Sequence, residues 1–195
     1  MLAPIQEACD RFSITTSNLR VAAFLAQIGH ESAGLSQFSE SFNYSVAALR
    51  ATFRRMTPSL AATLGRQPGA PALSLATQQR IASIVYAGQM GNGDAASGDG
   101  WRYRGSGVLG LTFRDNFEAF GAACGIDVLA NPDLVRTDPA TAALSGAWFW
   151  FTNGCNTLAD AQSFDSITRR INPAMAGADE RRALYNAARK ALGIA

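Results

Sequence analysis

Residues 24–34 read Phe-Leu-Ala-Gln-Ile-Gly-His-Glu-Ser-Ala-Gly, a stretch that places a carboxylate at the end of an apolar pattern. Apolar side chains recur at helical spacing, at Val21, Phe24, Leu25 and Ile28. The spacing predicts a helix that buries one apolar stripe and ends at Gly34. At about 100° per residue, Glu31 falls about 70° from the centre of the stripe, so its carboxyl is expected at the edge of the buried face.

Helical patterns also occur in most of the remaining chain, whereas the alternation typical of strands is almost absent. Thr15, Thr16 and Ser17 offer an N-cap for the helix just described. Further helices are predicted over residues 2–12, 45–55, 76–87, 113–123, 139–151, 163–171 and 179–192. The chain is therefore predicted to be mainly α, with at most a small β-hairpin. We expect one domain over residues 1–195, with two lobes divided by the glycine-rich middle.

Two segments lack a helical pattern. Residues 57–75 carry three prolines and two glycines, which predicts an irregular, mobile excursion. Residues 88–100 are too rich in glycine for a regular element, and residues 101–112 are compatible with a small hairpin. Thr112 or Asp115 is expected to cap the helix that follows.

Composition excludes several classes of function. The net charge of +2 gives no reason to expect a nucleic-acid partner. Cys9, Cys124 and Cys155 are odd in number and widely spaced, so we expect buried free thiols in a reducing compartment rather than disulfides or a zinc site. The N-terminus lacks the features of a signal peptide, and the most apolar run, residues 140–151, is too short to span a bilayer. No cofactor, no metal and no stable membrane insertion are predicted.

His30 and Glu31 invite comparison with zinc proteases. The helical zinc motif needs a second histidine four positions after the first, and that position is Gly34. Because His30 is the only histidine, a Ser-His-Asp hydrolase built on another histidine is excluded as well. A pairing of His30 with Cys124 or Cys155 stays open in principle, although no local signature supports it.

Two carboxyl groups are better suited to general acid–base hydrolysis. Glycosidases need one carboxyl kept protonated by a site of low polarity and one ionised carboxylate. Glu31 beside the apolar face is the natural acid, and Glu40 among polar neighbours is the natural base. The structural alternative is a helix-end charge at Glu31 and a solvated loop residue at Glu40. Trp101 and Tyr103 could stack on sugars, although packing in a core is the commoner role of a single aromatic residue of this kind.

Taken together, these residues resemble glycoside hydrolase family 19, a chitinase-like family that includes many bacteriophage endolysins. The matching pieces occur in the family's order and extend over about residues 15–192; they are Phe24–Gly34, Ser39–Ser45, Tyr86–Thr112, Asn116, Ile167–Asn172 and Arg181–Tyr185. The match looks closer to the compact phage and prophage enzymes than to the plant chitinases. The resemblance implies a lysozyme-like, two-lobed helical fold and an inverting mechanism on β-1,4-linked N-acetylated sugars.

The resemblance also implies a role for individual residues. Glu31 matches the general acid and Glu40 the base that activates water, with carboxyl groups roughly 6.5–9.5 Å apart. Thr112 matches a residue that helps to hold the water. Asn116 and Asn172 match asparagines that line sugar subsites. Arg181 matches an arginine that organises charge beneath the cleft, and Trp101, Tyr103 and His30 complete the candidate substrate-binding residues.

Three positions depart from the family pattern. Ser106 stands where the family has an arginine, Gly110 where it has a glutamine, and Pro173-Ala174 where it has two glycines. Losing a hydrogen bond to substrate costs on the order of 1 kcal/mol, and more if the bond strengthens in the transition state. We therefore expect altered subsites and weaker activity, with catalysis retained because both glutamates are present.

Three hypotheses follow. The first is a monomeric endolysin that cleaves the glycan strand of peptidoglycan, accumulates in the cytoplasm of the host bacterium and reaches the periplasm through a holin-type pore. The second is a chitinase that acts on chitin oligomers. The third is a non-catalytic glycan-binding protein of the same fold, and Ser106 and Gly110 are its best support.

Overall fold

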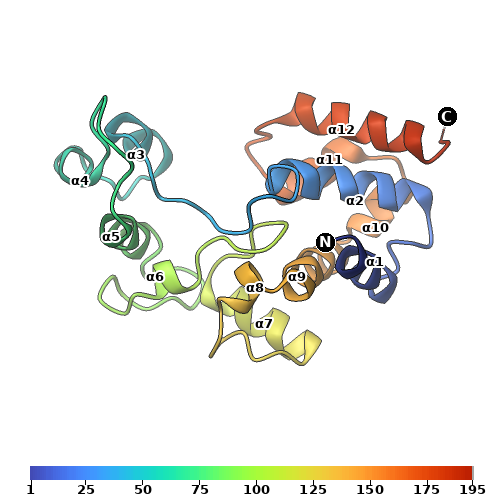
Figure 1. The fold of residues 1–195 in the computed structure, drawn as a ribbon, viewed down its shortest axis with the longest axis horizontal. Coiled ribbons are helices and arrows are strands. Elements are labelled where there is room, and N and C mark those ends of the chain that lie inside the picture. Colours follow the sequence, from blue (N-terminus) through green and yellow to red (C-terminus); the bar gives the residue numbers. More distant parts are fainter. Residues whose placement is uncertain (195) are drawn as a thin grey trace. The chain divides into compact units, whose positions relative to one another are not determined.

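The structure is a computed structural model, it describes residues 1–194, and it is mainly helical (Figure 1). Twelve helices lie within this part of the chain: α1 (Leu2–Arg11), α2 (Asn18–Glu31), α3 (Val46–Thr52), α4 (Pro58–Leu64), α5 (Leu75–Val85), α6 (Asp99–Arg102), α7 (Arg114–Cys124), α8 (Leu134–Thr137), α9 (Pro139–Thr152), α10 (Cys155–Asp160), α11 (Phe164–Ile171) and α12 (Ala178–Ala191). Within residues 1–194, β-pairing is confined to two isolated bridges, Ser45 with Arg66 and Ser106 with Leu111. The prediction of a mainly α fold is confirmed.

The chain forms two compact units, and each has its own core. Unit 1 contains Met1–Phe38, Ser106–Leu111 and the chain from Asp133 onward. In unit 1, α2 packs against α12, and α9 packs against α1 and α8 (Figure 1). Its core is centred on Phe24, Ile28, Trp150 and Ile167.

Unit 2 contains Ser39–Gly105 and Thr112–Pro132, and therefore α3 to α7. Its main core gathers apolar residues of α3, α4 and α5 around Phe42, which is completely buried. The centre of the Phe42 ring lies 5.6–6.3 Å from the centres of four other aromatic rings. The prediction that the glycine-rich middle divides two lobes is wrong, because residues 88–100 belong wholly to unit 2.

Two local predictions are also wrong. Residues 58–64 form a helix, since Pro58 occupies its first turn and the hydroxyl of Thr57 accepts a hydrogen bond from the backbone N–H of Leu60. Neither Thr112 nor Asp115 caps α7, because the N-cap is Phe113, which has a positive φ of 74°. A proline in the first turn of a helix was read as a helix breaker, and a cap residue with positive φ, Phe113, is of a type that the sequence does not mark as a cap.

Other predictions hold in part. Cys9, Cys124 and Cys155 are free thiols; Cys9 and Cys155 are buried and Cys124 is half-buried. Burial raises the pKa of Cys9 to about 12 and that of Cys155 to about 11. Within residues 1–194, no helix combines the length and the apolar character needed to cross a bilayer.

Candidate active site

Glu31 is the last residue of α2 in unit 1. The buried face of this helix carries Phe24 and Ile28, each 1% exposed, whereas Leu25 is 38% exposed and lies outside the stripe. The side chain of Glu31 is 25% exposed. The predicted position of Glu31 at the edge of the buried face is therefore confirmed.

Arg181 holds the Glu31 carboxylate from α12. Its guanidinium donates to Glu31 Oε1, to Gln27 Oε1 at 2.5 Å and to the carbonyl oxygen of Ala176 at 3.2 Å. Gln27 donates in turn to Thr168 Oγ1 at 2.8 Å. Because Arg181 and Gln27 are both essentially inaccessible to solvent, a buried polar network connects α2, α11 and α12 behind Glu31.

His30 also lies in unit 1, but it faces the start of α12. Its ring packs against Gly177, the N-cap of α12, where an added Cβ would collide with the imidazole. His30 Nδ1 lies 3.4 Å from Glu180 Oε2. These contacts join α2 to α12 and give no evidence of a substrate-binding role, which stays a prediction.

Glu40 belongs to unit 2 and is held by uncharged donors. Its Oε2 accepts the backbone N–H of Gly105 at 3.0 Å, and the hydroxyl of Tyr86 lies 2.9 Å from Oε1 and 3.1 Å from Oε2. The backbone N–H of Glu40 donates to the carbonyl oxygen of Gly105 at 2.8 Å. Both ends of the residue are thereby fixed to the same glycine.

Burial raises the pKa of Glu40, although the hydrogen bonds from Gly105 and Tyr86 and the charge of Arg104 oppose the shift. Burial and the nearby Glu40 charge likewise raise the pKa of Tyr86. The structural alternative, in which Glu40 is only a solvated loop carboxylate, is therefore wrong. A raised pKa is compatible with a general base, because proton transfer is efficient when the pKa of the base lies near the operating pH, but it is also the property expected of a glycosidase acid. The division of roles between Glu31 and Glu40 therefore stays a prediction from the family resemblance.

Thr112 lies close to Glu40 within unit 2. A Cβ placed on Gly105 would lie 3.1 Å from Glu40 Oε2 and 3.5 Å from Thr112 Oγ1. Glu40 and Thr112 therefore both lie beside Gly105, on the side where any other residue would carry its Cβ. The side chain of Asn116 donates to the carbonyl oxygen of Thr112 at 2.7 Å and fixes the turn that carries it.

The two residues predicted to stack on sugars, Tyr103 and Trp101, differ in burial. Tyr103 is 3% exposed, packs on Phe117 and directs its hydroxyl to the carbonyl oxygen of Leu129, so its stacking role is wrong and it belongs to the core. Trp101 is half-buried. The guanidinium of Arg104 lies 3.8 Å from the centre of its ring and donates to Ser39 Oγ.

The three departures from the family pattern have different local settings. Ser106 is buried and accepts a hydrogen bond at 2.6 Å from Arg136 of α8, so a guanidinium lies beside this serine. Gly110 is exposed with a φ of 67°, a conformation that disfavours a glutamine. Asn172 accepts from the backbone N–H of Ala174 at 3.1 Å, which fixes the turn through Pro173.

Sequence reasoning did not identify Tyr86, Gly105, Gln27 or Arg136 as part of the site. Tyr86, Gly105 and Gln27 fall inside segments that match the family, which was the available signal, whereas Arg136 lies outside all of them. Within the described chain, no group of three or more His, Cys, Asp and Glu residues could hold a metal ion.

Comparisons with known proteins agree with this architecture. The family described as Chitinase class I, glycoside hydrolase family 19, matches residues 74–187. A Haemophilus influenzae protein described as a glycosyl hydrolase family 19 domain-containing protein is 39% identical over 173 residues, which are 88% of this chain and 79% of that protein. The crystal structure of chitinase C from Streptomyces griseus superposes with a TM-score of 0.61 and 25% identity, over 99% of this chain and 68% of that one.

Similarity to plant enzymes is more local. Chitinase 2 of Oryza sativa subsp. japonica is 40% identical over 84 residues, which are 43% of this chain and only 24% of that protein. Glu31 and Glu40 precede the residues that match the family, so their individual roles stay predictions. The length of the family match and the identity to the Haemophilus influenzae protein are nevertheless decisive: the chain belongs to glycoside hydrolase family 19.

Proposed function

We propose that this protein hydrolyses β-1,4 glycosidic bonds of peptidoglycan by an inverting mechanism, with Glu31 as general acid and Glu40 as general base. The observation that carries the proposal is that both carboxyl groups are positioned by hydrogen-bonding partners that are buried or half-buried. Arg181 holds Glu31, while Tyr86 and Gly105 hold Glu40. Surface carboxylates without a function rarely need such support.

In this mechanism each glutamate moves one proton. Glu31 donates its proton to the glycosidic oxygen as the bond to the anomeric carbon breaks. Glu40 removes a proton from a water molecule, whose oxygen bonds to the opposite face of that carbon. Thr112 would help to orient the water, and Asn116 and Asn172 would contribute to the sugar subsites. The inverted configuration requires the two carboxyl groups to be roughly 6.5–9.5 Å apart in the substrate complex.

The choice of peptidoglycan rests on the resemblance of the sequence to the compact phage and prophage enzymes. The bacterial relative that is matched along most of both chains carries only the family name, and a bacterial chitinase shares the fold. Under this proposal the enzyme is a monomer that accumulates in the cytoplasm of a host bacterium and reaches the wall through a holin-type pore. The substrate and the route are separate parts of the proposal. A lysis assay with and without a co-expressed holin tests the route.

Digestion of purified sacculi, followed by mass spectrometry, tests both activity and the bond cleaved. We expect muropeptides from the wild type and a loss of about 10²–10⁴-fold in rate for Glu31→Gln and for Glu40→Gln. Glu118→Gln, a substitution of the same type at an exposed position of α7, is the matched control. Equal rates for wild type and Glu31→Gln would refute the catalytic assignment, and a β-anomer as first product would refute inversion.

A chitinase is the second candidate, favoured by the local similarity to plant chitinases. It predicts soluble oligomers from chitin and none from sacculi. Binding without catalysis is the third candidate, and the exposed turn at Gly110 is its remaining support. It predicts that sacculi retain the protein without release of new reducing ends.

A further inference from the structure

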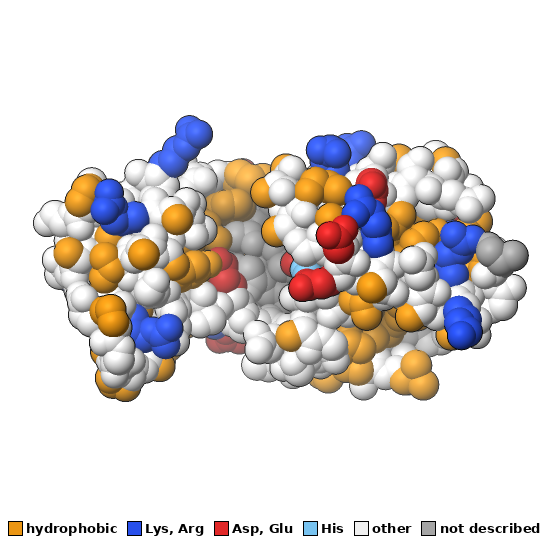
Figure 2. Space-filling view, turned by 90° about the horizontal axis from the view of Figure 1, so that it is seen from above, with side chains coloured by type: hydrophobic (Ala, Val, Ile, Leu, Met, Phe, Trp, Pro, Cys, Tyr) orange, Lys and Arg blue, Asp and Glu red, His pale blue; other side chains and the backbone are white. Residues whose placement is uncertain are grey.

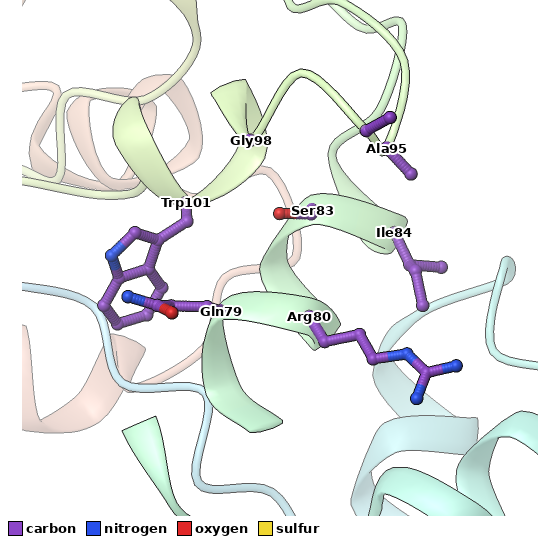
Figure 3. Close-up of a pocket in the computed structure, with 8 residues that line it drawn as sticks. Gln79, Arg80, Ser83, Ile84, Ala95, Gly98 and Trp101 are labelled. Carbon is purple, nitrogen blue, oxygen red and sulfur yellow. The ribbon is translucent and has the colours of Figure 1, made fainter. Parts of the chain in front are cut away.

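Unit 2 carries a surface pocket of about 540 Å³ between α5 and the loop that leads into α6 (Figure 3). One wall is formed by four residues of α5: Gln79, Arg80, Ser83 and Ile84. Trp101 of α6 lies on the other side of the pocket. Figure 3 shows the Arg80 side chain extending from α5 away from Trp101. The pocket therefore combines an aromatic end, small polar groups and a cationic end.

The charge of Arg80 is not neutralised by a neighbouring carboxylate. Arg80 is exposed, and none of the ion pairs found within residues 1–194 includes it. Asp94 and Asp99 flank the loop of the pocket, but their carboxylates accept backbone N–H groups: Asp94 from Ala96 and Ser97, and Asp99 from Gly93. The guanidinium is thus available to an anionic group of a ligand.

Arg80 belongs to a segment with an unusual charge distribution. Residues 41–93 contain no Asp and no Glu, and their charged residues are Arg50, Arg54, Arg55, Arg66 and Arg80. On the face of unit 2 that Figure 2 shows, Arg side chains stand apart from Asp and Glu side chains. Such a surface attracts anionic ligands.

The pocket is also linked to Glu40 inside the same unit. Trp101 forms its wall, Arg104 stacks on the Trp101 ring, and Arg104 donates to Ser39, the residue before Glu40. Gly105, the residue after Arg104, donates to the Glu40 carboxylate. Two short routes therefore connect the pocket to the proposed general base: both begin at the Trp101–Arg104 contact, and one continues through Ser39 and the other through Gly105.

We propose that this pocket binds the peptide stem of peptidoglycan, with the guanidinium of Arg80 paired to a carboxylate of the stem. Ile84 and Ala95 would contact the methyl groups of alanine residues, and Gln79 and Ser83 would bond to the peptide groups. Chitin has neither a peptide nor a carboxylate, so the pocket would contribute to the choice between the two glycans. This inference rests on the proposed function and specifies its substrate.

The test compares Arg80→Glu with Arg54→Glu, which changes the charge equally at an exposed arginine outside the pocket. A soluble disaccharide tetrapeptide is the binding probe, and sacculi and chitin hexamer are the substrates. We expect Arg80→Glu to weaken binding of the probe and to raise KM for sacculi about fivefold. Arg54→Glu should stay within about twofold, and neither should alter chitin hexamer turnover. Ser83→Trp, which fills the pocket without a change of charge, should act like Arg80→Glu.

Equal losses for Arg80→Glu and Arg54→Glu would overturn the inference in favour of a general electrostatic attraction, and so would unchanged binding in Arg80→Glu and Ser83→Trp. The binding arm does not depend on catalysis. A wild type that binds the tetrapeptide but cleaves only chitin would overturn the proposed function and leave the pocket supported. A wild type that cleaves sacculi but does not bind the tetrapeptide would overturn the pocket proposal and leave the proposed function supported.

Discussion

The two glutamates of this chain show two different ways to hold a carboxyl group. In unit 1, Glu31 is fixed by a buried cation, Arg181, which is itself held by Gln27 and a backbone carbonyl. In unit 2, Glu40 is fixed by the neutral donors Tyr86 and Gly105 in surroundings rich in aromatic rings. A charged partner makes the position of Glu31 depend on the integrity of a core network. The hydrogen bonds from neutral partners do not offset the cost of burying the charge of Glu40, and the pKa of Glu40 is therefore raised.

This contrast predicts the largest loss of stability at Arg181. Arg181→Met should reduce the free energy of unfolding by about 3–5 kcal/mol, because it leaves Gln27 and the partly buried Glu31 without their partner. Denaturant unfolding at neutral pH measures the effect. Arg182→Met removes an exposed arginine of the same helix and should cost far less. A similar cost at both positions would mean that the buried network does not stabilise unit 1.

A smaller effect is expected at the glycine that holds Glu40. In Gly105→Ala, the new methyl group would lie 3.1 Å from Glu40 Oε2 and 3.2 Å from Glu40 Cβ, so the carboxylate must move. Overpacking of this kind costs about 1–3 kcal/mol. We expect a rate on sacculi at least about tenfold lower, since small displacements of catalytic groups reduce rates strongly.

Gly110→Ala is a control for the added methyl group, because a Cβ at Gly110 meets no atom within 4 Å, although its φ of 67° adds a backbone cost that Gly105 does not have. It tests the backbone cost of a residue with positive φ without displacing a catalytic side chain. If Gly110→Ala lowers the rate as much as Gly105→Ala, the close contact with Glu40 is not the cause.

The sequence predicted the position of Glu31 better than the surroundings of Glu40. Helix periodicity placed Glu31 correctly, since α2 carries its own apolar stripe over consecutive turns. The partner of Glu40 is Tyr86, 46 residues away, and no local pattern indicates that contact. The polar neighbours of Glu40 in sequence suggested solvent, whereas tertiary packing places its carboxylate against the Tyr86 hydroxyl and the Gly105 backbone. The guanidinium of Arg136 beside Ser106 was missed for the same reason, because the two residues are 30 positions apart.

Two predictions were wrong because one residue type can have two structural roles: a proline can interrupt or begin a helix, and an aromatic ring can pack in a core or bind a ligand. Prolines and glycines in residues 57–75 predicted an irregular segment, yet Pro58 opens α4 because a proline fits the first turn of a helix. Tyr103 was a candidate for sugar stacking, and nothing in the sequence distinguishes an aromatic ring in a core from one on a surface. Family resemblance correctly predicted the helical fold, but burial decided which aromatic residues remain available.

Tyr86→Phe tests the neutral side of the comparison through pH. Removing the hydroxyl removes a donor that lowers the Glu40 pKa, so that pKa should rise further. A general base must be ionised, and the acidic limb of the pH–rate profile should therefore move to higher pH. The loss of stability should be about 1 kcal/mol. Tyr44→Phe, at a tyrosine of the same aromatic cluster with no hydrogen bond to Glu40 among those found, should leave the limb in place. An unchanged limb in Tyr86→Phe would show that Glu40 is not the base that the profile reports.

The smallest expected effect is a pH-dependent gain in stability in Glu40→Gln. The folded protein binds the Glu40 proton more tightly than the unfolded chain, because burial raises this pKa above its ordinary value of 4.5. Between the two pKa values the folded state therefore holds more protons, and stability falls as pH rises through that window. Glutamine cannot ionise, so Glu40→Gln avoids this loss while its side-chain oxygen still accepts from Tyr86 or Gly105. Thermal melts of wild type and Glu40→Gln should coincide below about pH 4 and diverge in favour of the variant as pH rises. The same comparison for Glu118→Gln corrects for the removal of a negative charge, and a variant that loses stability relative to wild type as pH rises would contradict the sign of the Glu40 shift.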